Sequence, residues 1–141
     1  MNCSQPYQFK YYYMASMQNI DSYTHTRGES IYLDDIPLQQ GTLFGAVYGS
    51  PVAHGKILSL DISAAAAMPG VVRIFTHHDI PGENQIGGIV PDEPLLADGE
   101  VHFHGMPVAF VVADSTERAQ AAIKKIQMTV NPLPVVTDPR V

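Results

Sequence analysis

The sequence predicts a single α+β domain, and three observations support this class. The chain has 141 residues, 45% of them hydrophobic and 16% charged, which is typical of one globular domain. Residues 43–75 and 107–131 each combine two strand-like segments with a helical segment between them. A stretch rich in proline and glycine separates these two strand–helix–strand units. We expect both units to pack on one small mixed sheet, with residues 25–141 forming the domain.

Residues 1–24 carry little of the hydrophobic pattern that a core needs. They contain polar amides and three consecutive tyrosines, Tyr11 to Tyr13. Chain ends without a core pattern are commonly loosely attached, so we expect a loosely ordered N-terminal extension. An alternative is an arm whose tyrosines dock on a partner, because protein interfaces are enriched in tyrosine.

The first strand–helix–strand unit follows from alternation and from helix-ending residues. Period-two alternation predicts strands over residues 43–48 and 58–62. In the second of these strands, one apolar face would carry Leu58, Leu60 and Ile62. Ser63 is expected to cap a short helix over the following alanines, which Pro69 and Gly70 would end. Residues 71–75 are then expected to return as a strand.

The second unit has a clearer pattern. Residues 107–113 form a continuous apolar run, as expected of a strand covered on both faces. Asp114 and Glu117 have a spacing similar to a capping box, which predicts a helix start. The helix would turn an apolar stripe toward the sheet, composed of Ala119, Ala122, Ile123 and Ile126. Residues 127–131 are expected to form the last strand.

Composition and charge exclude several classes of function. The net charge is −6, and the eight basic residues are scattered, which argues against binding nucleic acid or an anionic membrane. The sequence contains no apolar run long enough for a transmembrane helix. A single cysteine, Cys3, excludes an internal disulfide framework and fits a reducing compartment, so we expect a cytoplasmic protein.

Candidate catalytic groups are weak. Adjacent carboxylates on a strand point to opposite faces, which makes Asp34–Asp35 and Asp92–Glu93 poor acid–base pairs, and Asp98 with Glu100 has no stronger pattern. Nucleophile elbows, phosphate loops, dinucleotide fingerprints and cysteine clusters do not occur in the sequence. We therefore expect no catalytic residue in this chain.

The histidines offer an alternative interpretation, in which the chain is an independent small metal- or ligand-binding protein. They form two close pairs, His77 with His78 and His102 with His104. A His-x-His pair on a strand places both rings on one face, which suits a metal. A third ligand would have to come from Asp79 or His54. The simpler interpretation is that these are polar residues at strand ends.

A series of short phrases carries a family resemblance over roughly residues 26–139. They are GESIYLDDIP (28–37), AHGKILSLD (53–61), PGVV (69–72), DIPGEN (79–84), DEPLLAD (92–98), GMPVA (105–109) and LP (133–134). In this order they resemble the α/β hammerhead domain that begins the molybdenum-binding large subunit of xanthine dehydrogenases and aldehyde oxidases. One departure is Val130-Asn131-Pro132, where the family commonly has a Tyr-Glu pair.

The resemblance implies a scaffold in an oxidoreductase complex. Such enzymes hydroxylate purines, aldehydes or other heterocycles with a molybdopterin cofactor, and electrons leave through two 2Fe–2S clusters and FAD. The resemblance places these cofactors on other domains or subunits, so none is expected on this chain. The implied partners are the molybdenum-binding domains and the iron–sulfur and FAD domains or subunits. An isolated copy is expected to self-associate through the surface that normally meets them.

The resemblance also implies a site. The loop that contains Gly88, Ile89, Val90 and Pro91 would form part of the wall of the substrate funnel, with Ile89 as an apolar gate. The family continues beyond the position of Val141, so we expect a fragment, a truncated reading frame or one part of a split subunit. A further alternative is a regulatory fragment that binds the authentic subunit without supporting turnover.

Overall fold

The computed structural model describes residue 19, residues 21–138 and residue 140, and it divides into two units, residues 1–38 and 39–141. The first unit contains the helix α1 (Ser22–Arg27) and the 3₁₀ helix η1 (Leu33–Asp35). In η1 the Asp35 carboxylate accepts a hydrogen bond from the backbone N–H of Tyr32 at 3.0 Å. This carboxylate therefore closes a turn. The proposed tyrosine arm, Tyr11 to Tyr13, lies outside the described residues, and the boundary at residue 24 stays a prediction.

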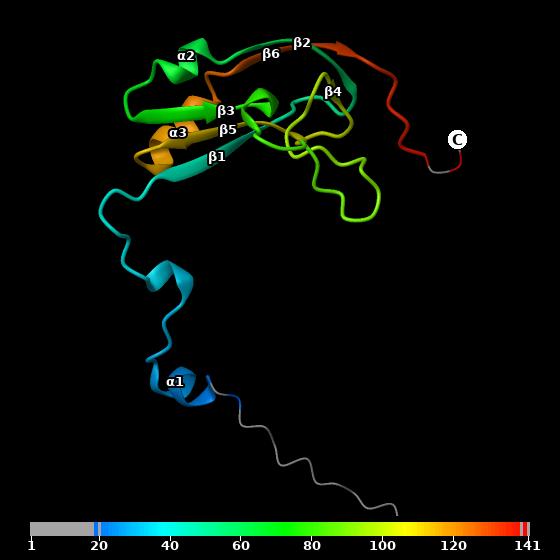
Figure 1. The fold of residues 1–141 in the computed structure, drawn as a ribbon. Helices are drawn as coiled ribbons and strands as arrows, with labels where there is room; N and C mark the ends of the chain where they lie inside the picture. The colour runs from blue at the N-terminus through cyan, green and yellow to red at the C-terminus, as the bar shows by residue number, and fades with distance from the viewer. Residues whose placement is uncertain (1–18, 20, 139, 141) are drawn as a thin grey trace, which may run out of the picture. The chain divides into compact units, whose positions relative to one another are not determined.

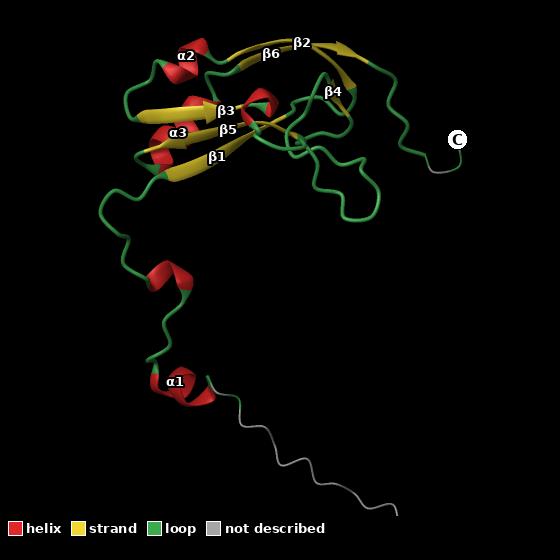
Figure 2. Cartoon of the chain, in the orientation of Figure 1, coloured by secondary structure: helices red, strands yellow, loops and turns green. Residues whose placement is uncertain are grey.

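The second unit contains two three-stranded antiparallel sheets (Figures 1 and 2). One sheet has the order β1-β5-β3, formed by Phe44–Gly49, Pro107–Ala113 and Val71–Phe75. The other has the order β4-β2-β6, formed by Glu100–Val101, Gly55–Asp61 and Gln127–Pro132. All described strand pairs are antiparallel. The α+β class is confirmed, but the strands form two sheets where one mixed sheet was predicted.

The two strand–helix–strand units are present, and each passes from one sheet to the other. The helix α2 (Ser63–Ala66) connects β2 to β3, and α3 (Thr116–Ile123) connects β5 to β6. A parallel crossover within one sheet needs about a dozen residues or more. The connection between β2 and β3, residues 62–70, is shorter than that. The chain therefore places β3 in the β1-β5-β3 sheet and not beside β2, which local alternation alone does not predict.

Small side chains let α3 pack closely on the β1-β5-β3 sheet. Ala119 of α3 lies in one cluster with Ala46 of β1 and Ala113 of β5, and all three are buried. The larger core cluster adds residues of α2, of α3, of the sheet and of the turn after α3, namely Ala65, Ile74, Ala109, Val111, Ala122 and Ile126. The apolar stripe predicted for this helix is confirmed. Every described helix is too short or too polar to cross a lipid bilayer.

A β-bulge changes which residues of β2 face inward. The register shifts between Ile57 and Ser59, so Leu58 is an extra residue without a partner. Ile57 and Leu60 are half-buried, whereas Leu58 is 65% exposed. The predicted face of Leu58 and Leu60 is therefore wrong at Leu58, because the bulge interrupts the period of two.

Both predicted helix caps are displaced by one or two residues. Ser63 does not cap α2; instead the Asp61 carboxylate accepts a hydrogen bond from the Ser63 N–H at 2.9 Å, which lowers the pKa of Asp61. At α3 the cap is Ser115, whose hydroxyl oxygen accepts a hydrogen bond from the Arg118 N–H at 3.3 Å. Asp114 pairs with the Arg118 guanidinium instead. The extended backbone of Ser115 suits an N-cap.

Candidate functional site

The loop of residues 84–96 is closed at its base by one asparagine. The Asn84 side chain donates from Nδ2 to the carbonyl oxygen of Leu96 at 2.7 Å. Its Oδ1 accepts from the Leu96 N–H at 3.0 Å. The amide thus satisfies both backbone groups of Leu96, which is itself buried. This double hydrogen bond fixes the two ends of the loop together.

Further hydrogen bonds order the interior of the 84–96 loop. The Gln85 Oε1 accepts from the N–H of Gly87 at 2.6 Å and of Glu93 at 3.2 Å. The Ile86 N–H donates to the Glu93 carbonyl at 2.8 Å. A Cβ at Gly87 would overlap the Val90 carbonyl oxygen, so the turn requires glycine there. The loop has no helix or strand, yet its path is set by its own polar groups.

The four residues predicted for the substrate funnel lie together in this loop. Gly88, Ile89, Val90 and Pro91 are all exposed, and Ile89 is 98% exposed. Figure 1 shows the loop in lime green, extending beyond the strands of its own unit. An ordered loop that holds an apolar side chain in solvent is suited to contact with another surface. The four residues at its tip, Gly88 to Pro91, include no acid, base or nucleophile.

An apolar groove, which we call the outer groove, covers the face of the β1-β5-β3 sheet that α3 leaves open. Val47, Phe110 and Phe75 are cross-strand neighbours on the three strands. Together with Ile80, Pro81, Leu95, Leu96, Pro107 and Asp79 they line a cavity of about 500 Å³. Phe110 is 37% exposed, so the prediction that β5 is covered on both faces is wrong at this residue. The outer groove shares Leu95 and Leu96 with the 84–96 loop.

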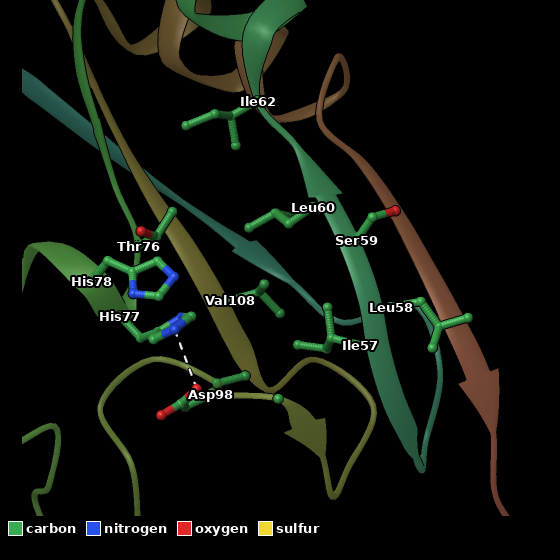
Figure 3. Close-up of a pocket in the computed structure, with 12 residues that line it drawn as sticks. Ile57, Leu58, Ser59, Leu60, Ile62, Thr76, His77, His78, Asp98 and Val108 are labelled. Atoms are coloured by element: carbon green, nitrogen blue, oxygen red, sulfur yellow. Dashed lines mark ion pairs between the residues drawn. The ribbon is translucent and has the colours of Figure 1, made fainter.

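The first histidine pair lies beside a different pocket, shown in Figure 3. His77 and His78 belong to the 3₁₀ helix η2 (His77–Asp79), and their ring centroids are 3.8 Å apart. The His77 Nε2 lies 3.2 Å from Asp98 Oδ1. The pocket has a volume of about 400 Å³, and Figure 3 shows Ile57, Leu60 and Ile62 pointing into it while Leu58 and Ser59 point away.

The two histidines of the second pair, His102 and His104, do not share one site in the structure. His102 and His104 follow β4 in a turn, so the predicted strand geometry is wrong for them. Among the residues that the structure describes, one group of three side chains has the geometry to hold a metal ion, and it contains His54, Glu100 and His102. His54 was a predicted third ligand, whereas Glu100 was missed, because it lies 46 positions from His54 and meets it only in the folded chain. His77, His78 and His104 lie outside this group, so the four histidines do not form one site.

Hydrogen bonds fix the orientation of the His54 ring. Its Nδ1 lies 2.8 Å from the Pro134 carbonyl oxygen, and its Nε2 lies 3.0 Å from Glu100 Oε1. The Pro134 carbonyl and the Glu100 carboxylate are both acceptors that favour the protonated imidazole. They therefore raise the pKa of His54 above its ordinary value.

Comparison with known proteins agrees with this geometry. Residues 27–134 match the family described as aldehyde oxidase and xanthine dehydrogenase, a/b hammerhead domain. Xanthine dehydrogenase 1 of Arabidopsis thaliana is 40% identical over 122 residues, which are 86% of this chain and 9% of that protein. A probable xanthine dehydrogenase component of Bacillus subtilis is 37% identical over 112 residues, or 79% of this chain and 15% of that protein. A Cu,Mo-CO dehydrogenase structure aligns with a TM-score of 0.76 at 36% identity, covering 86% of this chain and 16% of that chain.

The fold and these matches define an α/β hammerhead domain. The chain belongs to the aldehyde oxidase and xanthine dehydrogenase family, as the sequence phrases predicted. It spans only 9% to 16% of the length of the three relatives named. The matches therefore assign the domain, and the activity of a whole enzyme has to be argued separately.

Proposed function

We propose that this chain is the scaffold that frames the substrate funnel in a molybdopterin-dependent hydroxylase of the xanthine dehydrogenase type. The observation that carries the proposal is the 84–96 loop, whose internal hydrogen bonds hold Ile89 fully in solvent. Holding an apolar side chain there has no benefit for the fold of this chain. It is useful where a neighbouring domain brings a substrate channel against the loop, so that Ile89 limits access by van der Waals contact.

The outer groove supports docking on the neighbouring molybdenum-binding domains of the same enzyme. Val47 and Leu95 are exposed in it beside Phe110, and apolar surface of this kind normally meets a partner. The groove and the 84–96 loop share Leu95 and Leu96, so a domain seated in the groove would also lie beside the loop. In an isolated chain the same surface is expected to drive self-association.

Three cavities in the described part of the chain do not fit a pterin cofactor. None of the three described cavities has a lysine or arginine in its lining, and the phosphate of a pterin needs charge-assisted hydrogen bonds. We therefore derive no catalytic step on this chain. In the proposed complex the molybdopterin, the 2Fe–2S clusters and FAD belong to other domains or subunits. We place the complex in the cytoplasm, because one cysteine cannot form a disulfide within the chain.

A domain exchange tests the funnel role. The matching segment of the Bacillus subtilis relative would be replaced by residues 27–134 of this chain, and the assembled enzyme assayed with xanthine and with a larger aromatic aldehyde. We then expect Ile89→Ala to change the ratio of kcat/KM for the two substrates by about fourfold. This estimate takes the contact of one methylene group, about 0.8 kcal/mol, as the part that distinguishes the substrates.

Val72→Ala is the matched control, because Val72 is an exposed apolar residue of β3 that lines none of the three cavities. It should leave the substrate ratio unchanged. An exchanged enzyme that assembles and turns over, but whose substrate ratio is the same with and without Ile89→Ala, would refute the funnel role. Failure of the exchanged protein to assemble with its partners would refute the scaffold role itself.

Sedimentation of the isolated chain tests the outer groove. The wild-type chain should self-associate with rising concentration, and Phe110→Glu should shift it toward the monomer. Val72→Glu adds the same charge outside the groove and should leave the association unchanged. Circular dichroism of each variant checks that the fold is kept. A monomeric wild-type chain at all concentrations would contradict the expected exposure of a docking surface.

A further inference from the structure

We propose that His54, Glu100 and His102 form a zinc site at the end of the β4-β2-β6 sheet where β2 begins and β4 ends. The His54 Nε2 lies 3.0 Å from Glu100 Oε1, and the His102 Nδ1 lies 3.8 Å from the same oxygen. All three ligand atoms lie within 4.8 Å of one another. A tetrahedral zinc with bonds of about 2.0–2.2 Å separates its ligand atoms by about 3.3–3.6 Å. The two measured distances lie on either side of that range.

Strand pairing brings the three residues together from distant parts of the sequence. His54 directly precedes β2, Glu100 begins β4, and His102 directly follows it. The β2–β4 pairing aligns Gly55 with Val101 and Lys56 with Glu100. The β2–β4 pairing therefore holds Glu100 within the sheet and brings His54 and His102, which directly adjoin the paired strands, to the same end of it. The ring centroids of His54 and His102 are 6.0 Å apart.

The hydrogen bond to Pro134 prepares His54 for a metal. A carbonyl oxygen only accepts, so the Nδ1 that lies 2.8 Å from it carries the proton. The lone pair of Nε2 then points at the Glu100 carboxylate, which is also an acceptor. Two acceptors at 3.0 Å need a positive charge between them, either a proton or a metal ion. A histidine that donates its other N–H to a carbonyl is the usual arrangement at metal sites.

The ligand chemistry favours zinc. Two imidazole nitrogens and one carboxylate are a known zinc ligand set, with water in the fourth position. Magnesium and calcium prefer ligand sets made only of oxygen atoms. His54 and His102 line a cavity of about 450 Å³, which leaves room for that water. The side chains of His54 and Glu100 are 31% and 32% exposed, so an ion can enter from solvent.

A bound ion would cross-link three segments of the domain. A bound ion would join the start of β2 to both ends of β4, and through Pro134 it would also hold the segment that follows β6. Zinc binding should therefore stabilise the folded chain, because an ion that binds only the native state shifts the unfolding equilibrium. Such a role is independent of whether the domain frames a substrate funnel.

Metal titration of the complete 141-residue chain tests the site. The chain would carry Cys3→Ser, so that the thiol does not compete, and would be titrated with zinc by calorimetry and with cobalt by visible absorption. We expect one zinc per chain, the visible bands of a tetrahedral cobalt site, and a higher melting temperature with zinc. His102→Ala should weaken zinc binding at least tenfold and abolish the thermal shift.

His104→Ala is the matched control, since His104 is an exposed histidine of the same turn that lines the same cavity but lies outside the group of three ligands. It should bind zinc as the parent chain does. Glu100→Gln provides a second ligand variant of nearly the same shape, in case His102→Ala alters the turn, and it should also lose affinity. Absence of stoichiometric zinc, cobalt bands that are not tetrahedral, or equal losses in His104→Ala and His102→Ala would each overturn the proposal.

Discussion

Asn84→Ala should destabilise the whole domain although the residue lies in a loop. The substitution removes both hydrogen bonds between the Asn84 amide and the backbone of Leu96, at 2.7 and 3.0 Å. Each such bond contributes roughly 0.5–1.5 kcal/mol, and a buried group left without a partner costs about 1–3 kcal/mol. Leu96 is buried, but the opened loop admits water to it. We therefore expect a loss of about 2–3 kcal/mol in the free energy of unfolding.

Urea unfolding and hydrogen exchange measure the two parts of this prediction. With a slope of about 1–3 kcal/mol per molar urea, the midpoint should fall by roughly 0.7–3 M. The amide of Ile86, which donates to Glu93 inside the loop, should exchange faster. Asn131→Ala is the control, because Asn131 is exposed on β6 and its side chain forms no hydrogen bond with any described residue. An Asn84→Ala chain with the parent midpoint and parent exchange at Ile86 would refute the reasoning.

Three more predictions concern single contacts. Ser115→Ala removes the N-cap of α3 and should cost about 1 kcal/mol in chemical unfolding, with a Ser115→Asp variant close to the parent. Gly55→Ala places a Cβ against Val130 and 2.9 Å from a backbone oxygen of β6, so overpacking should lower the urea stability by about 1–3 kcal/mol. The pKa of Asp79 is lowered mainly by the hydrogen bond from the Thr76 N–H and next by the one from the Arg73 side chain. The stabilisation of the fold by Asp79 is therefore complete above the ordinary aspartate pKa and is lost as the pH falls through the lowered value. The stability difference between the parent and Asp79→Asn should accordingly shrink as the pH falls below about 4, and a constant difference would contradict this.

Local patterns predicted the strands and helices of the two strand–helix–strand units, but they predicted neither α1 nor the short strand β4. Residues 107–113 were predicted as a strand from their apolar run, and the structure has β5 at Pro107–Ala113. The bulge at Leu58 was not predictable, because it depends on how β6 pairs with β2. The division into two sheets was missed for the same reason. Alternation shows that a segment is extended but carries no information on its partner.

The candidate sites show the same limit. Gly88 to Pro91 were placed in a loop correctly from proline and glycine content, while the role of Asn84 in closing that loop was missed. Asparagine is common in loops, so its type gives no sign of a partner twelve positions away. His54 and Glu100 are separated by 46 positions and meet only through the β2–β4 pairing. The spacing of His102 and His104 instead suggested a pair that the turn does not form.

The pairing pattern of the strands has a practical consequence. Among the described residues, each pair joins one strand from β1 to β3 with one from β4 to β6, so neither half of the described chain contains a hydrogen-bonded strand pair of its own. Formation of the sheets must wait for long-range encounters, which slows folding. A chain cut at the tip of the 84–96 loop would give two pieces that each lack ordered sheets alone but reconstitute the domain when mixed. The domain is thus suited to use as a split reporter, whose signal appears only when both pieces meet.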